Sequence, residues 1–290
     1  MFNDQKHIRK CISSIFNQTI DNFEIIIVDD ASTDKTSEII RSFNDKRIRY
    51  YRNEEKVGIA QSRNRCIRLA AGDILFFTDS DCIVSKDWLE KGRLAFAHQN
   101  CIGTEGKTIY VAPGYQPTFS DRVVENHEPG HYMTCNIAYR RIVFENVGCF
   151  DTRFNRNSDR DFGLRASKFG KISFNPDMLV VHQRITFTPL QFVRWGRNIE
   201  NWVLLYKLHK DTSSIGENWK QRDKKSFFLP VVFPERLIGI FFPPLVLVSL
   251  TRHRFRTKND FNLIPFIYIQ IIYERLRLWG MCAKQRVLMI

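Results

Sequence analysis

Two aspartates, one residue apart, follow an apolar run in the first third of the chain. Residues 74–77 are Ile-Leu-Phe-Phe, and after one threonine comes Asp79-Ser80-Asp81. A short apolar run that ends in polar residues is typical of a buried strand, and ligands bind at the carboxyl ends of strands in open α/β sheets. Two carboxylates this close favour a positive charge beside them. They predict a divalent cation and the phosphates that it carries, with two solvated loop aspartates as the alternative.

Other polar side chains also follow apolar runs. Asp29 and Asp30 follow residues 23–28 and begin the sequence Asp-Asp-Ala-Ser-Thr-Asp, whose composition also favours a turn or a helix cap. His182 closes a second apolar run, residues 172–181, where a purely structural histidine is equally expected. Since strand ends meet at one edge of a sheet, these side chains are expected to lie near the Asp79 and Asp81 pair.

The elements that must position these residues alternate along the chain. Strands are predicted at 23–28, 48–52, 74–77 and 172–181, with shorter strands between 100 and 150, and helices at 1–18, 36–43, 58–71, 86–96, 157–169 and 190–209. Asn3 or Asp4 could cap the first helix. Since the strands are too apolar to have a solvated face, the pattern predicts an α/β fold with a mostly parallel sheet covered on both sides.

The charge of the chain is concentrated near its end. The net charge is +13 over 290 residues, with 26 Lys and Arg against 24 Asp and Glu in residues 1–183, and 18 against 7 in residues 184–290. This asymmetry predicts contact with an anionic surface. The basic residues do not line an aromatic-interleaved groove, so no nucleic acid partner is expected. The seven cysteines are scattered without a CxxC pair, which favours free thiols.

The last part of the chain has the composition of a membrane-associating region. Residues 186–225 are expected to form an acceptor-side helix and a linker, and residues 226–290 contain apolar runs of about 13 or 14 residues between basic clusters. Such runs are shorter than the roughly 20 residues that span a bilayer, so they favour the interface. A buried core helix and a spanning hairpin are the alternatives. The expected location is the cytoplasmic face of a membrane, bound peripherally or monotopically.

Four segments, taken together and in order, resemble the family-two inverting glycosyltransferases of GT-A fold. They are FEIIIVDDASTDKT (23–36), GIAQSRNRCIRLAAGDILFFTDSDC (58–82), CNIAYRRIVFENVGCFD (135–151) and NSDRDFGLR (157–165). The resemblance covers residues 1–185. It implies a GT-A, Rossmann-like domain that transfers a sugar from a nucleotide-diphosphate sugar to a glycan or lipid-linked acceptor, with Mn²⁺ or Mg²⁺ as cofactor.

The resemblance also implies roles for individual residues on the donor side. Asp81 would coordinate the metal, with His182 as a second ligand, and Asp79 would lie toward the ribose or a metal-bound water. Asp30 would contact the base. The metal would neutralise the leaving diphosphate as a Lewis acid.

Three further residues have implied roles. Arg63 would lie near the nucleotide, although a solvated helix charge is the alternative. Asn3 ends the segment that helps to hold the base. Asp159 occupies the position of the general base that takes the proton from the acceptor hydroxyl. Since the family's usual Glu-Asp pair reads Ser158-Asp159 here, Asp161 could take this role instead, and both acids could simply stabilise a helix N-terminus.

A fifth segment, residues 191–195, reads Gln-Phe-Val-Arg-Trp and resembles the Gln-x-x-Arg-Trp motif of processive members such as cellulose synthases. By this resemblance Arg194 would meet the diphosphate and Trp195 would stack on the acceptor sugar. An amphipathic, membrane-facing helix is the competing interpretation.

The chain departs from the family at its start. Residues 1–4, Met-Phe-Asn-Asp, correspond to the end of the family's first strand, so a central parallel strand is expected to be missing and stability to be poor. A late start codon, a truncation and a fold that tolerates the gap are the possible explanations. An inactive nucleotide-sugar-binding remnant is therefore an alternative function. A second is a haloacid-dehalogenase-type phosphatase with Asp79 as nucleophile and Asp81 as acid or base.

Overall fold

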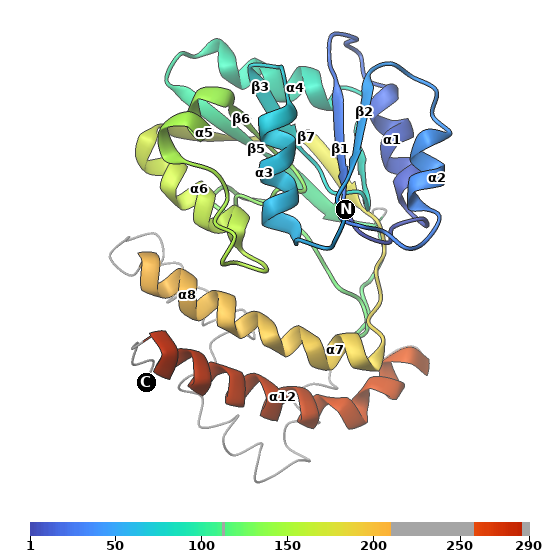
Figure 1. Cartoon of the computed structure of the whole chain (residues 1–290), viewed down its shortest axis with the longest axis vertical. Helices are drawn as coiled ribbons and strands as arrows, with labels where there is room; N and C mark the ends of the chain where they lie inside the picture. The colour runs from blue at the N-terminus through green and yellow to red at the C-terminus, as the bar shows by residue number, and fades with distance from the viewer. Residues whose placement is uncertain (112–113, 210–257, 286–290) are drawn as a thin grey trace. The chain divides into compact units, whose positions relative to one another are not determined.

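The computed structural model describes residues 1–111, 114–209 and 258–285 (Figure 1). The chain divides into two compact units. The first unit is Met1–Tyr115 with Val123–Arg184, and the second is Gln116–Arg122 with Ile185–Ile290. The predicted linker at 210–225 and the apolar and basic segment at 226–257 lie outside the described residues.

The first unit alternates between helices and strands. Its helices are α1 (Ile8–Phe16), α2 (Thr36–Arg41), α3 (Ile59–Leu69), α4 (Trp88–Leu94), α5 (Arg141–Val147) and α6 (Ser158–Phe169). Its strands are β1 (Ile25–Asp29), β2 (Ile48–Arg52), β3 (Ile74–Phe77), β4 (Cys82–Val84), β5 (Cys101–Tyr110), β6 (Ile137–Arg140) and β7 (Lys171–His182). The prediction of an α/β fold is confirmed.

The strands form a parallel pair, β1–β2, and a five-stranded sheet in the order β3-β6-β5-β7-β4. In the larger sheet only β5 and β7 are parallel, while β3–β6, β5–β6 and β4–β7 are antiparallel. The expectation of a mostly parallel sheet is therefore wrong in this detail. The strands between 100 and 140 pair with distant segments, and this pairing leaves no local pattern in the sequence.

The connection from β3 to β4 carries the Asp79-Ser80-Asp81 sequence across the end of the sheet. β3 and β4 lie at opposite edges, yet β3 ends at Phe77 and β4 begins at Cys82. In a flat sheet of this order, β3 and β4 would be separated by four strand spacings of about 4.8 Å each. This distance exceeds the roughly 17 Å that the connecting residues can span. The sheet must therefore curl, and the two aspartates lie across its end.

Helices cover both faces of this sheet, as predicted. On one face, α3, α5 and α6 bury a cluster with β3, β5 and β6 that includes Tyr139 and Phe162. On the other face, α4 packs on β4, β6 and β7 through Trp88 and Met178. A third cluster joins α1 and α2 to β1 through Ile8, Ile12 and Ile40. The unit therefore has three apolar clusters, two on the larger sheet and one on β1.

Met1 pairs with β1 as a single residue of a parallel strand. Its amino group donates to the Val28 carbonyl at 3.0 Å, and the Asp30 amide donates to the Met1 carbonyl at 2.8 Å. The β1–β2 pair and the sheet that begins at β3 are separate among the described residues. This separation falls where the sequence predicted a missing central strand.

The first helix is shorter than predicted, and one helix was missed. The first helix begins at Ile8, and neither Asn3 nor Asp4 caps it, because His7 precedes the helix and makes no side-chain cap. Asn3 is instead tied to Thr33 and adopts a left-handed conformation. Helix α5 was not predicted.

The second unit contains α7 (Pro189–Trp195), α8 (Ile199–His209) and α12 (Lys258–Gln285). The predicted helix at 190–209 is broken by a 3-10 turn, Gly196–Asn198, where a Cβ on Gly196 would lie 3.3 Å from the Gln270 carbonyl oxygen of α12. Phe192 packs with Leu263 and Ile267, and Val203 packs with Leu278. Among the described helices, none has the length and apolar character needed to cross a bilayer.

Candidate active site

The structure places Asp81 beside His182. Cys82, the first residue of β4, is opposite His182, the last residue of β7, in an antiparallel pair. The Gln183 amide extends this pairing by donating to the Asp81 carbonyl at 2.7 Å. As a result, His182 Nε2 lies 3.5 Å from Asp81 Oδ1, with the His182 side chain 1% exposed. Two residues that were predicted as metal ligands are thus neighbours.

The hydrogen bonding of His182 suits a cation between these two groups. Its Nδ1 lies 3.0 Å from the Gln183 carbonyl, which can only accept a hydrogen bond. A neutral ring that donates from Nδ1 turns the Nε2 lone pair toward the Asp81 carboxylate. Two lone pairs facing each other at this distance repel unless a proton or a cation lies near them. The donor set of one carboxylate and one imidazole fits Mn²⁺ well, and Mg²⁺ less well.

Cys82 completes a group of three potential ligands whose atoms lie within 4.8 Å of one another. Its thiol is fully buried, and its pKa is raised well above the ordinary value by a hydrogen bond with Cys135 and by burial. Since metal binding needs the thiolate, the thiol is a poor ligand in this setting. The geometry therefore favours Asp81 and His182 over Cys82.

Arg63 reaches the same edge of the sheet from helix α3. Its guanidinium donates to Asp79 Oδ1 at 3.0 Å and lies over the Phe150 ring at 5.9 Å. The Arg63 side chain is 14% exposed, whereas that of Asp79 is 34% exposed. The ion pair places a positive charge beside Asp79, at the end of β3.

The two acids at the start of α6 have different surroundings. Asp161 is 2% exposed, and its carboxylate accepts two hydrogen bonds from Arg165, at 3.0 and 2.8 Å. Asp159 is partly exposed and accepts hydrogen bonds from the Thr134 hydroxyl at 3.2 Å and the Thr134 amide at 3.4 Å. The geometry favours Asp159 over Asp161 for a role that needs access to a substrate.

Residues 134 and 135 connect the Asp79 and Asp81 pair with Asp159 at the start of α6. Thr134 contacts Asp159, and the neighbouring Cys135 contacts Cys82, which directly follows Asp81. Both groups therefore lie at one edge of the same unit. Thr134, Cys135 and Cys82 were not predicted as site residues. The CNIAYRR segment begins at Cys135, so the nearest sequence signal starts one residue after Thr134.

Asp30 holds the loop that precedes α3. Its carboxylate accepts hydrogen bonds from the Val57 and Gly58 amides at 2.9 Å each, and from the Asn53 side chain at 2.8 Å. Burial alone would raise the pKa of Asp30, but these hydrogen bonds outweigh burial and lower it. Asn3 binds Thr33 and Ser32, in the loop that follows β1. Contact of Asp30 and Asn3 with a base stays a prediction.

Arg194 and Trp195 belong to the second unit. Trp195 lies against the Phe187 ring at 5.2 Å and under the Arg122 guanidinium at 5.1 Å, while Arg194 is exposed. Gln191, the first residue of the motif, forms a capping box with Thr188. Gln191 of the motif thus has a structural role as a helix cap, and the roles of Arg194 and Trp195 stay predictions.

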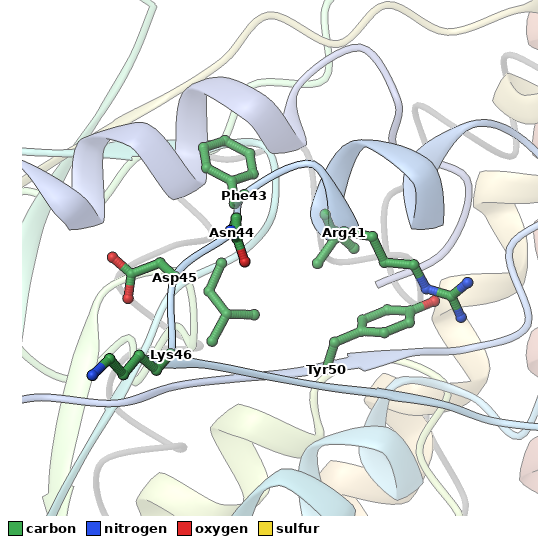
Figure 2. A pocket seen from close by; sticks show the side chains of 8 residues that line it. Arg41, Phe43, Asn44, Asp45, Lys46 and Tyr50 are labelled. Atoms are coloured by element: carbon green, nitrogen blue, oxygen red, sulfur yellow. The ribbon is translucent and has the colours of Figure 1, made fainter.

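A surface pocket of about 440 Å³ lies elsewhere in the first unit (Figure 2). It is lined by α2 and β2 and by the loop between them, with Arg41, Phe43, Asp45 and Tyr50 among its residues. Asp45 is paired with Arg47. No predicted site residue lines this pocket, so it is not the candidate active site.

The curled sheet, the acidic sequence across its end and the facing acid on α6 define the GT-A glycosyltransferase fold. The profile of the Glycosyl transferase family 2 matches residues 1–148. The chain belongs to this family.

Relatives in two organisms are similar in sequence. The chain is 28% identical over 174 residues to glycosyltransferase GlyA and 40% identical over 92 residues to glycosyltransferase GlyG, both of Streptococcus pneumoniae. These alignments cover 59% and 31% of this chain but only 23% and 31% of the two relatives. Glycosyltransferase AglE of Haloferax volcanii is 26% identical over 220 residues, which is 70% of this chain and 72% of AglE.

Solved structures share the fold. The mannosyltransferase PcManGT of Pyrobaculum calidifontis, in complex with GDP-Man and Mn²⁺, matches with a TM-score of 0.65 at 15% identity, over 96% of this chain and 85% of that one. TarS of S. aureus matches with a TM-score of 0.60 at 19% identity, over 98% of this chain and 53% of that one. At these identities the likeness establishes the fold.

The low pKa of Asp30 generates a pH-dependent prediction. A carboxylate whose folded pKa lies below its ordinary 3.8 stabilises the fold above that pH, and this stability is lost as the pH falls through the folded pKa. Asp30→Asn should lower the free energy of unfolding by about 1–3 kcal/mol at pH 7. The difference from the wild type should narrow below pH 3.8, as measured by urea unfolding. Asp177→Asn, at an exposed position, is the control, and a difference that does not change with pH would contradict the assignment.

Proposed function

We propose that this chain transfers a sugar from a nucleotide-diphosphate sugar to a hydroxyl of a glycan or a lipid-linked acceptor, with inversion at the anomeric carbon. The observation that carries the proposal is the 3.5 Å approach of His182 to Asp81 at the strand ends, with Arg63 and Asp79 at the same edge. Family membership supports it. The donor nucleotide and sugar are left open, since the structural relatives were solved with UDP, UDP-GlcNAc and GDP-Man.

Asp81, with His182, would hold Mn²⁺ or Mg²⁺, as their donor atoms fit such an ion. When bound, the ion supplies Lewis-acid neutralisation of the leaving diphosphate. Arg63 adds a fixed positive charge at the same edge. Asp79 accepts a hydrogen bond from this guanidinium, and its carboxylate would contact the ribose or a metal-bound water.

Asp159 would accept the proton of the acceptor hydroxyl as that oxygen attacks the anomeric carbon. A general base must be accessible and held in one orientation. The two hydrogen bonds from Thr134 fix one carboxylate oxygen, Oδ2, and the other, Oδ1, accepts the Arg160 amide at 2.9 Å. Asp161 forms an ion pair with Arg165 and would position the helix.

The metal-side prediction concerns Asp81. In the wild type, a nucleotide sugar at about 100 times its Kd should stabilise the protein by about 2.7 kcal/mol, and only when Mn²⁺ is present. Asp81→Ala should abolish this stabilisation, because a carboxylate ligand is lost. A thermal-shift panel of UDP and GDP sugars with and without Mn²⁺ measures the effect, with Asp177→Ala as the control. Full metal-dependent stabilisation in Asp81→Ala would refute the metal assignment.

The base-side prediction concerns Asp159. Asp159→Asn should keep donor binding, because its contacts are with Thr134 and Arg160, and should lower sugar transfer by about 100-fold or more. Product formation from a labelled donor and calorimetric donor binding measure the two quantities. Transfer at the wild-type rate would show that the base is another group. Donor binding without any transfer by the wild type would favour the inactive remnant.

Association with an anionic membrane is also proposed, from the second unit. Exposed apolar side chains recur at helical spacing along α12: Phe261, Ile269, Ile272, Leu276 and Trp279, each about half exposed or more. The buried face of α12 carries Leu263, Ile267 and Leu278 instead. Residues 184–290, which include α12, carry a net charge of +11. An apolar stripe in such a basic region suits the interface of an anionic bilayer, where tryptophan is a common anchor.

Substitution within this stripe tests the membrane proposal. The double variant Leu276→Ser with Trp279→Ser should reduce flotation with phosphatidylserine-containing vesicles at least several-fold, because it removes apolar area that would enter the interface. Leu94→Ser with Ile142→Ser is a matched control, since Leu94 is 59% exposed and Leu276 is 60% exposed. Equal flotation of the two double variants would place the membrane contact elsewhere or refute it.

A further inference from the structure

Glu105 is a buried acid that neither the family resemblance nor the proposed chemistry uses. It lies on β5, between β6 and β7, opposite Ile137 on one side and Phe174 on the other. The residue is 1% exposed. Burying a carboxylate in the middle of a sheet is unfavourable unless it accepts several hydrogen bonds. The partners of Glu105 therefore indicate what it does.

Three of these partners are the backbone amides of one loop, and the Asn126 side chain also donates to Oε2 at 3.5 Å. Glu105 Oε1 accepts the Gly130 amide at 2.7 Å, and Oε2 accepts the amides of His131 and Tyr132 at 3.0 and 2.7 Å. Gly130 and Tyr132 both have positive φ, at 92° and 55°, which turns successive amides toward one point. Burial raises the pKa of Glu105, and the three amides oppose this rise. The carboxylate thus serves as the centre of a clamp around residues 130–132.

The clamped loop rests directly on helix α6. A Cβ built on Gly163 would lie 2.1 Å from Tyr132 Cγ, so the Tyr132 ring fills the space that glycine leaves. Gly163 is four residues after Asp159 and therefore lies one turn further along the same face. The loop and the turn that carries Asp159 are packed against each other.

The same loop ends at a second fixed point. The buried Asn136 accepts a hydrogen bond from the Trp88 indole at 2.8 Å and donates to the carbonyls of Lys107 and Met178, each at 2.8 Å. Only three residues separate Tyr132 from Asn136. Thr134, in the middle of these three, is 2% exposed and donates from its hydroxyl and amide to Asp159. Its position is set by the two fixed points.

We infer that Glu105 is a positioning residue that, through the 130–134 loop, sets the orientation of Thr134 and hence of the Asp159 carboxylate. This inference rests on the proposed function for the role of Asp159 in transfer. The clamp itself rests only on the contacts of Glu105. Glu105 touches no substrate in this arrangement, and it acts on the rate through the geometry of the base.

The test uses Glu105→Gln, which keeps the shape but replaces one acceptor oxygen by a donor that faces backbone amides. It should lower kcat between about 10-fold and 100-fold, with the KM for the donor changed less than about two-fold, because only the base is displaced. Thr134→Val should likewise lower kcat while changing the KM for the donor only slightly. In an Asp159→Asn background, Glu105→Gln should cause no further loss of residual transfer. A further loss of the same size there would show that Glu105 does not act through Asp159.

Glu24→Gln is the matched control. Glu24 also accepts two backbone amides of a turn, those of Ala71 and Gly72, but none of its contacts is with residues 126–136 or Asp159. The Glu24→Gln variant should lower the Tm without lowering kcat selectively relative to KM. A Glu105→Gln variant that behaves like Glu24→Gln would reduce Glu105 to a structural role and overturn the inference.

Amide hydrogen exchange separates this inference from the proposed function. Glu105→Gln should speed exchange at residues 130–134 by about ten-fold or more and leave residues 25–29 of β1 unchanged. Unchanged exchange at 130–134 overturns the clamp, whatever the activity. Faster exchange there, in a chain whose wild type transfers no sugar from any donor, supports the clamp and overturns the proposed function.

Discussion

The candidate site depends on the register between β4 and β7. With Cys82 opposite His182, Asp81 and the imidazole are neighbours, whereas a slip by one residue would turn His182 to the other face of the sheet. Burial sets this register, since Cys82, Val84 and Val180 are all in the core beneath the site. The position of the predicted metal ligands therefore follows from the apolar packing of neighbouring residues on the same two strands.

Carboxylates hold the loops around this edge where apolar packing cannot. Asp30 accepts the amides of Val57 and Gly58, and Glu105 accepts those of residues 130–132. A loop that carries polar side chains toward a ligand cannot bury many of them, so buried acceptors for its amides are an effective way to order it. The two acids differ in their electrostatics. Hydrogen bonds lower the pKa of Asp30, whereas burial raises that of Glu105.

Local pattern explains which parts of this arrangement were predictable. The strands β2 and β3 were predicted to the residue, and acids at strand ends predicted that Asp81 would lie near His182. The strand order was not predictable, because it places β3 and β4 at opposite edges although four residues separate them, and such pairing depends on distant segments. Thr134 was missed for a similar reason. A single threonine has no periodicity, and its role arises only from its contact with Asp159.

Burial and pairing distinguish the two acids at the start of α6. Where the family's usual pair has a glutamate, this chain has Ser158, which is 1% exposed and cannot carry a negative charge. Asp161 is buried against Arg165, so movement of its carboxylate toward a substrate would break this ion pair. Asp159 is the acid of this turn that combines access with a defined hydrogen-bonded orientation. In the proposed reaction, the choice of Asp159 as proton acceptor follows from burial and pairing as much as from family resemblance.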